Sequence, residues 1–252
     1  DKRDRMLICT KIQPMANDRA TILRQADESL RRLRSDRIDV LLLHRPNPDI
    51  PIAESLGALT TLVQAGKVRY IGSSGFKAWQ ILEALHTAKD AGLAAFCMES
   101  SVYSLLCRYP EVELLPMLRT YGLGATAWSP LGGGVLTERY TPANPPAHMQ
   151  LTERQWAILD AVRTIARRHG CTASQVAFAW AIAQPGMTLA LAGVRTVEQL
   201  LDNAGAVSVQ LTTADSEELD AISPPGYTER TEWLGLRFGQ PPEGTVKRPI
   251  EK

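Results

Sequence analysis

Short apolar runs alternate with segments of helical periodicity along most of this chain, and this alternation constrains the fold more than any other feature. The runs are too short for helices and are typical of strands buried on both faces; they lie at residues 6–10, 38–43, 68–71, 94–98, 124–128 and 188–192. The periodic segments predict helices at residues 22–33, 53–64, 78–91, 111–121, 153–169, 173–183, 197–206 and 213–222. Six strand-helix units in this order predict an α/β fold with a parallel sheet and helices outside it.

The alternation permits two architectures, a closed barrel and an open doubly wound sheet. No G-x-G-x-x-G pattern follows the first predicted strand, although the nucleotide-binding form of the open sheet would carry one there. The pattern alone does not choose between the two. No shift in composition divides the 252 residues, so we expect a single domain.

Composition narrows the class of partner. The chain has 28 Lys and Arg against 27 Asp and Glu, and this balance argues against nucleic acid as a partner. No apolar stretch reaches the roughly 20 residues that span a bilayer, so no membrane partner is expected. The four cysteines form no C-x-x-C pair, which is typical of a reduced, cytoplasmic protein without a structural metal.

Polar and ionisable residues follow every predicted strand. In a barrel with helices outside, the loops after the strands build the catalytic mouth. The segments in question are Thr10-Lys11, His44-Arg45-Pro46, residues 72–76, residues 99–101, residues 128–134 and residues 193–196. We therefore expect a functional site where these strand ends meet.

Several of these segments, in this order, resemble the aldo-keto reductase family from residue 10 to residue 203. The most specific are residues 42–46 (LLHRP), 66–72 (GKVRYIG), 103–106 (YSLL), 128–134 (WSPLGGG) and Gly193-x-Arg195 followed by Gln199 and Asn203. The resemblance implies a (β/α)8 TIM barrel, of which six strand-helix units are visible here. It also implies NADPH-dependent hydride transfer between a nicotinamide and the carbonyl of a small-molecule substrate, which is an aldehyde, a ketone or a sugar.

The resemblance assigns catalytic roles to Lys11 and His44. A lysine at this strand lowers the pKa of a neighbouring tyrosine, because a buried cation stabilises the phenolate that forms when the tyrosine protonates the carbonyl oxygen. The histidine hydrogen-bonds and orients the substrate carbonyl.

The resemblance also places the nicotinamide. Ser74 corresponds to a serine that hydrogen-bonds the carboxamide, and Trp128 to an aromatic residue that stacks on the ring. Gly75 and Ser100 stand where the family usually has asparagine and glutamine, so the carboxamide contacts are expected to differ here.

Two further segments are expected to bind the phosphates and the adenosine. Ser129, Leu131 and Gly133 belong to a loop that straddles the pyrophosphate, where glycines let backbone amides approach an anion. Arg195 precedes a capping-box pattern, Thr196 to Gln199, which places it at a helix N-terminus suited to phosphate. The resemblance implies that Arg195 meets the 2′-phosphate of NADPH, with Gln199 and Asn203 near the adenine, and it includes Gly193 among the cofactor-binding residues.

Two members of the family's catalytic set, an aspartate and the tyrosine, come from the unit ahead of the lysine strand. No tyrosine precedes Lys11. We therefore expect residues 1–252 to be an N-terminally incomplete barrel domain whose intact form carries roughly 60 more residues before the lysine strand. Without them, little turnover is expected.

Two alternative functions remain at this point. One is an NADPH-binding regulatory subunit, similar to the β subunits of potassium channels, with little or no catalysis. The other is a barrel enzyme of a different class, with phosphate at Arg195 and Lys11 as a Schiff-base nucleophile. The Pro- and Gly-rich tail, residues 223–252, is expected to cover the barrel mouth, and its aromatic residues favour an apolar substrate portion: Tyr227, Trp233 and Phe238. Substrate identity, reaction direction and oligomeric state are left open.

Overall fold

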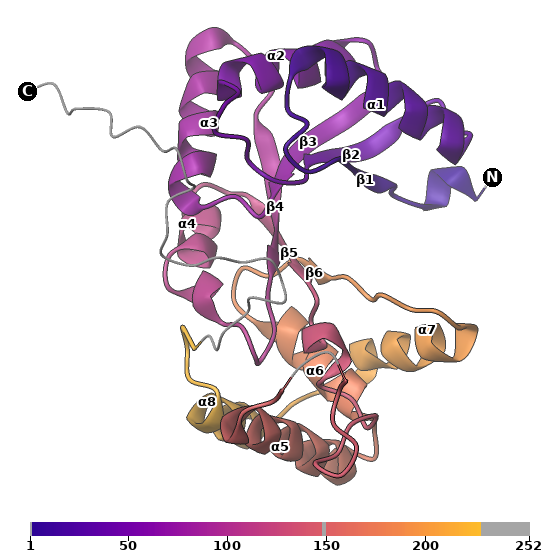
Figure 1. Ribbon diagram of the computed structural model, residues 1–252, viewed down its shortest axis with the longest axis vertical. Helices are drawn as coiled ribbons and strands as arrows, with labels where there is room; N and C mark the ends of the chain where they lie inside the picture. The colour runs from indigo at the N-terminus through magenta and orange to yellow at the C-terminus, as the bar shows by residue number, and fades with distance from the viewer. Residues whose placement is uncertain (1, 148–149, 228–252) are drawn as a thin grey trace, which may run out of the picture.

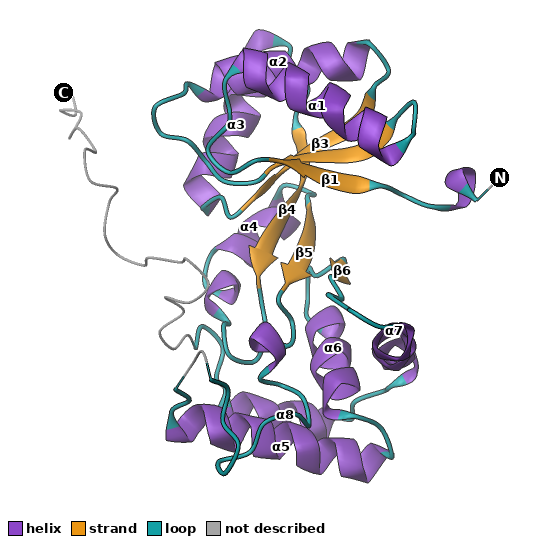
Figure 2. Ribbon diagram, turned by 45° about the vertical axis from the view of Figure 1, so that its right-hand side comes forward, coloured by secondary structure: helices purple, strands orange, loops and turns teal. Residues whose placement is uncertain are grey.

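Six parallel strands form one sheet in a computed structural model that describes residues 2–147 and 150–227. Neighbours in the chain are neighbours in the sheet: β1 (Cys9–Ile12), β2 (Ile38–Leu43), β3 (Val68–Ser74), β4 (Phe96–Val102), β5 (Gly124–Trp128) and β6 (Leu189–Ala190). Figures 1 and 2 show that β1–β3 and β4–β6 run at a steep angle to each other, so the sheet curls. In the described part of the chain β1 and β6 each have one neighbour, and the sheet is a half-barrel.

The helices lie between the strands in the predicted order. They are α1 (Arg19–Leu33), α2 (Ile52–Gln64), α3 (Ala78–Ala91), α4 (Leu114–Thr120), α5 (Glu153–His169), α6 (Ala173–Ala183), α7 (Val197–Ala204) and α8 (Thr213–Ile222). Short 3-10 turns occur at Arg3–Arg5, Tyr109–Glu111, Gly132–Gly134 and Gly205–Ser208. Figure 2 shows α1, α2 and α3 together on one side of the first three strands. The prediction of alternating strands and helices around a parallel sheet is confirmed.

Local capping fixes several helix ends. Thr172 accepts a hydrogen bond from the Gln175 amide, and the Gln175 side chain accepts one from the Thr172 amide, so the predicted capping box starts α6. Thr152 and Gln155 do the same for α5, which ends at Gly170 in the left-handed conformation.

Alternate residues of the strands face the helices and form the core. Leu41, Leu43, Ile71 and Ala127 are all at most 1% exposed and belong to one apolar cluster with the helices. Each fully buried leucine contributes about 1.5–3 kcal/mol relative to an exposed one. Lys11 is in register with Leu42, on the opposite, inner face of the sheet.

Some predicted boundaries are wrong. The first strand begins at Cys9 and not at residue 6, and Met6 and Leu7 are 63% and 81% exposed. This strand is an edge of the described sheet, so it has a partner on one side only. The last strand is reduced to two residues, and the fourth helix begins at Leu114 because a 3-10 turn containing Pro110 precedes it.

The fourth strand was predicted too early and too short. It runs from Phe96 to Val102, so Glu99, Ser100 and Ser101 lie inside the strand and not after it. Polar side chains that hydrogen-bond to neighbouring strands are stable within a sheet, although they interrupt the apolar pattern on which the prediction depended.

A buried arginine fastens the end of α8 to the segment after β4. Arg108 forms ion pairs with Glu111 at 2.7 Å and Asp220 at 2.5 Å and donates to the carbonyl oxygen of Ser223. Its guanidinium lies 5.0 Å from the ring centroid of Trp180. These contacts hold residues 220–223 in place. The tail predicted to cover the mouth, residues 223–252, lies mostly outside the described residues, which exclude 228–252 and with them Trp233 and Phe238.

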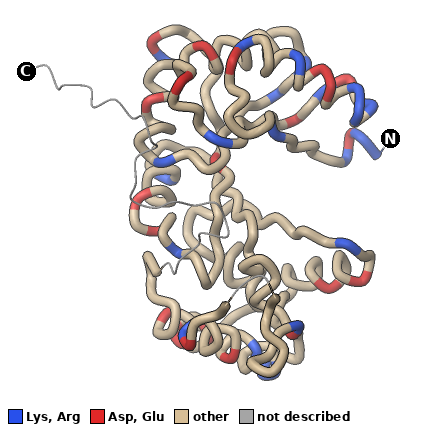
Figure 3. Tube along the Cα trace, viewed as in Figure 1, with Lys and Arg blue, Asp and Glu red and all other residues tan. Residues whose placement is uncertain are grey.

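Charged residues of both signs are spread over the helices. Figure 3 shows basic and acidic residues interleaved along the helices. Within residues 2–147 and 150–227, no helix is both long and apolar enough to cross a membrane, and no three His, Cys, Asp or Glu side chains form a metal-binding group.

Candidate functional site

Lys11 and His44 lie at the ends of neighbouring strands. Lys11 is in β1 and His44 directly follows β2, and both side chains are half-buried. Burial lowers the pKa of His44, and the charges of Lys11 and Arg45 lower it further. The imidazole is therefore neutral at pH 7 and retains one N–H donor for a carbonyl oxygen.

Hydrogen bonds join the end of β3 to β4. The Ser74 hydroxyl donates to the Ser100 carbonyl oxygen at 3.1 Å, and the Gly75 amide donates to the same oxygen at 3.0 Å. Gly75 has a φ of 67°, and a Cβ there would overlap Nη1 of Arg45. The Ser100 hydroxyl is buried and has no hydrogen-bond partner within residues 2–147 and 150–227.

Glu99 is a buried carboxyl group beneath this loop that the sequence analysis did not assign. It is 0% exposed and accepts hydrogen bonds from the Ser73 hydroxyl at 2.5 Å and the Phe76 amide at 3.2 Å. Burial raises the pKa of Glu99 to about 8, although these bonds oppose the shift. The group is therefore protonated at pH 7. A glutamate within an apolar strand was the available signal.

Trp128 ends β5 and contacts a residue that the sequence analysis left without a role. The guanidinium carbon of Arg45, at the exit of β2, lies 5.5 Å from the centroid of the Trp128 ring. Arg45 therefore bridges the mouth from β2 to β5.

Beyond Trp128 a cavity of about 640 Å³ brings together two segments far apart in the sequence. Seven residues predicted to bind the cofactor line it: Ser129, Leu131, Gly133, Gly193, Arg195, Gln199 and Asn203. Residues that the sequence analysis missed also line it, among them Glu138, Arg139 and Asp202. The volume is within the range of cofactor pockets.

The glycine-rich loop after β5 differs from expectation in one respect. The amides of Gly132 and Gly133 donate to the carbonyl and hydroxyl oxygens of Ser129, and the Gly134 amide donates to the Leu131 carbonyl oxygen. The amides expected to approach an anion are thus already paired within the loop. The glycines are needed for positive φ, and at Gly132 also for packing, since a Cβ would lie 2.6 Å from Leu106.

Arg195 stands where the sequence predicts, immediately before the first turn of α7. Thr196 caps the helix by accepting from the Gln199 amide at 3.3 Å. The Gln199 side chain accepts from the amide of Arg195 at 2.9 Å, one residue earlier than in a capping box. Arg195 is exposed, and Asn203 is buried behind it.

The predicted residues therefore occupy two connected places. Lys11, His44, Ser74, Ser100 and Trp128 do not line the cavity that holds Arg195. The two places join at the peptide between Trp128 and Ser129. An elongated ligand with a planar ring at one end and phosphates at the other fits this arrangement, and the unpartnered Ser100 hydroxyl provides a free hydrogen-bonding group for the ring end.

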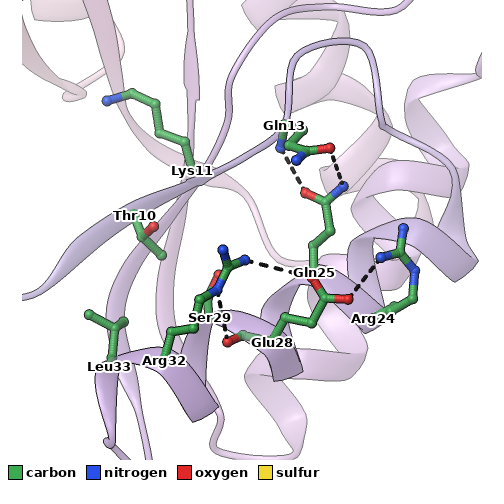
Figure 4. Close-up of a pocket in the computed structure, with 9 residues that line it drawn as sticks. All are labelled: Thr10, Lys11, Gln13, Arg24, Gln25, Glu28, Ser29, Arg32 and Leu33. Atoms are coloured by element: carbon green, nitrogen blue, oxygen red, sulfur yellow. Dashed lines mark hydrogen bonds and ion pairs between the residues drawn. The ribbon is translucent and has the colours of Figure 1, made fainter.

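A second cavity, of about 360 Å³, lies between β1 and α1 (Figure 4). Three of its charged residues pair with one another, since Glu28 contacts Arg24 at 2.9 Å and Arg32 at 3.6 Å. Figure 4 shows the ammonium group of Lys11 extended away from these residues. We assign no ligand to this cavity.

Comparisons with known proteins agree with this architecture. The sequence matches the family model described as "Aldo/keto reductase family" over residues 1–224. A thermostable aldo-keto reductase, Tm1743, solved with the inhibitor epalrestat, superimposes with a TM-score of 0.75 and 29% identity, covering 87% of this chain and 72% of that one.

Relatives by sequence fall into two groups. An uncharacterized oxidoreductase of Bacillus subtilis, YrpG, is 34% identical over 239 residues, which are 88% of this chain and 73% of that protein. A putative voltage-gated potassium channel subunit beta of Schizosaccharomyces pombe is 35% identical over 221 residues, covering 81% and 64%. A probable subunit of the same kind from Oryza sativa subsp. japonica is 32% identical over 219 residues, covering 80% and 67%.

The chain belongs to the aldo/keto reductase family, a family of oxidoreductases. The predicted fold class is thereby confirmed, because the half-barrel corresponds to consecutive units of a (β/α)8 barrel. The alternative of a barrel enzyme from another class finds no support.

Proposed function

We propose that this chain binds NADPH and serves in the reversible transfer of hydride between the nicotinamide and the carbonyl group of an aldehyde, ketone or sugar. The observation that carries the proposal is the cavity that joins Arg195, at the start of α7, to the loop after β5. A guanidinium at a helix N-terminus suits a phosphate dianion, and the 2′-phosphate distinguishes NADPH from NADH. The protein is expected to work in the cytoplasm.

The bound cofactor would supply the hydride, and the residues of this chain would orient the reactants. His44 would donate its N–H to the carbonyl oxygen, and Trp128 would stack on the nicotinamide ring. Lys11 would hold positive charge beside the oxygen that takes up a proton. The resemblance to the family implies a tyrosine as the proton donor beside Lys11.

A regulatory role is the second candidate, because relatives named as potassium channel β subunits match at 35% and 32% identity. Such a protein would bind NADPH as a sensor and turn over slowly or not at all. The two candidates share the cofactor site and differ in carbonyl-dependent oxidation.

The cofactor site is tested by titrating the protein with NADPH and with NADH, followed by fluorescence. Substituting Arg195→Met should weaken NADPH binding about 10–100-fold and leave NADH binding nearly unchanged, since one charge-assisted contact with the 2′-phosphate is lost. Arg31→Met, on the exposed face of α1, is the matched control. Equal loss for both nucleotides would contradict the assignment of Arg195.

Loss of NADPH absorbance with a panel of aldehydes then separates the two candidates. Oxidation that depends on the aldehyde supports the reductase. Tight NADPH binding without turnover, in a protein that carries the tyrosine, supports the regulatory subunit.

A further inference from the structure

Arg45 crosses the mouth of the half-barrel and contacts two of its strand ends. It leaves β2 next to His44, passes Gly75 at the end of β3, and places its guanidinium over the Trp128 ring at the end of β5. The path requires a glycine at position 75, because any Cβ there would overlap Nη1 of Arg45. Gly75 thus makes room for the guanidinium.

The guanidinium has donors that the protein does not use. Within residues 2–147 and 150–227, no group accepts a hydrogen bond from it, although the side chain is half-buried. The nearby carboxyl group is Glu99, whose pKa is raised to about 8 by burial, so at pH 7 it offers no negative charge to Arg45. A guanidinium has five N–H donors in a planar fork that matches carbonyl and carboxylate oxygens.

Other polar groups without protein partners lie on the adjoining strands. The hydroxyls of Ser100 and Thr126 are buried and have no partner among the residues that the structure describes, and these two residues are in register on β4 and β5. Buried polar groups normally have partners, so such a set indicates a place that a ligand or water completes. Trp128 lies two residues beyond Thr126 on β5 and supplies a flat surface beside these hydroxyls.

We propose that Arg45 is a nicotinamide-binding residue whose guanidinium, held between Trp128 and Gly75, donates to the carboxamide oxygen of the cofactor. The proposal rests on the proposed function and names the partner of the carboxamide at that same site. The Ser100 hydroxyl, on the residue whose carbonyl oxygen accepts from the Gly75 amide, would accept from the amide side of the group.

Affinities for two ligands test this role without measuring turnover. NADPH carries the nicotinamide, and adenosine 2′,5′-bisphosphate carries only the adenosine end. Arg45→Met should weaken NADPH binding about 10-fold and leave the bisphosphate unchanged, because only the hydrogen bonds to the carboxamide are lost. Arg45→Lys should fall between Met and the parent, since it keeps the charge but not the planar fork.

Outcomes that overturn the proposal are distinct from failure of the cofactor site. If Arg45→Met binds NADPH as tightly as the parent, or weakens both ligands equally, Arg45 does not bind the nicotinamide. If the parent protein binds neither ligand, the proposed function itself is wrong. Arg31→Met should behave as the parent with both ligands.

A double-substitution cycle tests the geometry. Gly75→Ala should displace the Arg45 guanidinium and weaken NADPH binding, but it should have little further effect in the Arg45→Met background. Alanine at a φ of 67° is strained, so the Tm should fall by about 2–4 °C in both backgrounds, which verifies that each variant folds. Equal weakening of NADPH binding by Gly75→Ala in both backgrounds would refute the contact.

Discussion

Two buried carboxyl groups in different halves of the molecule have opposite states of protonation. Glu99 in β4 and Asp215 at the start of α8 are both 0% exposed. Glu99 accepts hydrogen bonds from the Ser73 hydroxyl and the Phe76 amide, which are uncharged donors, and burial raises its pKa to about 8.

Burial would likewise raise the pKa of Asp215, but hydrogen bonds from Thr212, and then from His169 and Arg168, outweigh it and hold the pKa well below the usual value. Nε2 of His169 lies 2.7 Å from Oδ2 of Asp215, and Thr212 donates to the same oxygen twice, from its hydroxyl and its amide. The number and charge of the donors therefore decide whether a buried carboxyl group ionises. The ionised Asp215 joins α8 to α5 through its contacts with α5 side chains. The protonated Glu99 carries no charge to offset that of Arg45 at the mouth of the half-barrel.

The largest effect is expected for Asp215→Asn. The substitution removes the charge that His169 and Arg168 contact and weakens the cap of α8, which should cost about 2–3 kcal/mol of unfolding free energy at pH 7. Because the native pKa is lowered, this stability exists above the ordinary Asp pKa of 3.8 and is lost as the pH falls below it.

Urea unfolding from pH 2 to pH 7 measures this, and the two proteins should converge in acid. Asp160→Asn, on the exposed face of α5, is the control and should change stability by less than about 0.5 kcal/mol. If Asp215→Asn lost no more than the control at pH 7, the ion pairs would not stabilise the α5–α8 corner.

Glu99→Gln should have an intermediate effect, and one of opposite sign. Between the ordinary Glu pKa of 4.5 and about 8, the unfolded chain releases a proton that the native protein retains. Stability therefore falls by up to about 1.4 kcal/mol per pH unit across this window. Glutamine does not titrate, so the variant should gain about 2.5 kcal/mol of stability relative to the parent between pH 5 and pH 7.

Unfolding curves at pH 5, 6, 7 and 8 check this difference, with Glu217→Gln on the exposed side of α8 as the control. Parallel stability curves for Glu99→Gln and the parent would show that Glu99 is ionised throughout, as Asp215 is.

The smallest effect is expected for Ser73→Ala. Loss of the hydroxyl that donates to Glu99 should cost about 1 kcal/mol at pH 7 and raise the pKa of Glu99 further, since this bond favours the ionised form. The fall in the free energy of unfolding with rising pH should then continue above pH 8. The exposed Ser208→Ala is the control. If Ser73→Ala left the pH range of the fall in stability unchanged, the hydrogen bond from Ser73 would have no influence on the titration of Glu99.

Periodicity and caps predicted the helices well. The bounds of α3, α5, α6 and α8 agree with the sequence because Thr152, Thr172 and Thr212 are local start signals and Gly92 and Gly170 are local stop signals. Such signals lie within a few residues of the end that they define, so tertiary structure does not override them.

Strand ends were predicted less well, for a physical reason. Glu99 lies inside β4, where the hydroxyl of Ser73 on β3 donates to it, and Ser73 is 26 residues away in the sequence. The same holds for Arg45, whose contact with Trp128 spans 83 residues of chain between positions 45 and 128. The sequence motifs predicted which strand ends carry the site. The contacts of Glu99 and Arg45 could be recognised only in the structure.

The setting of His44 has a consequence for the working conditions of the site. Burial and two flanking cations keep its imidazole uncharged above pH 6.5, so shifts in acidity between 7 and 8 leave the hydrogen-bond donor of this ring unaltered. The hydrogen bond proposed between His44 and a carbonyl oxygen should therefore be insensitive to pH in this range.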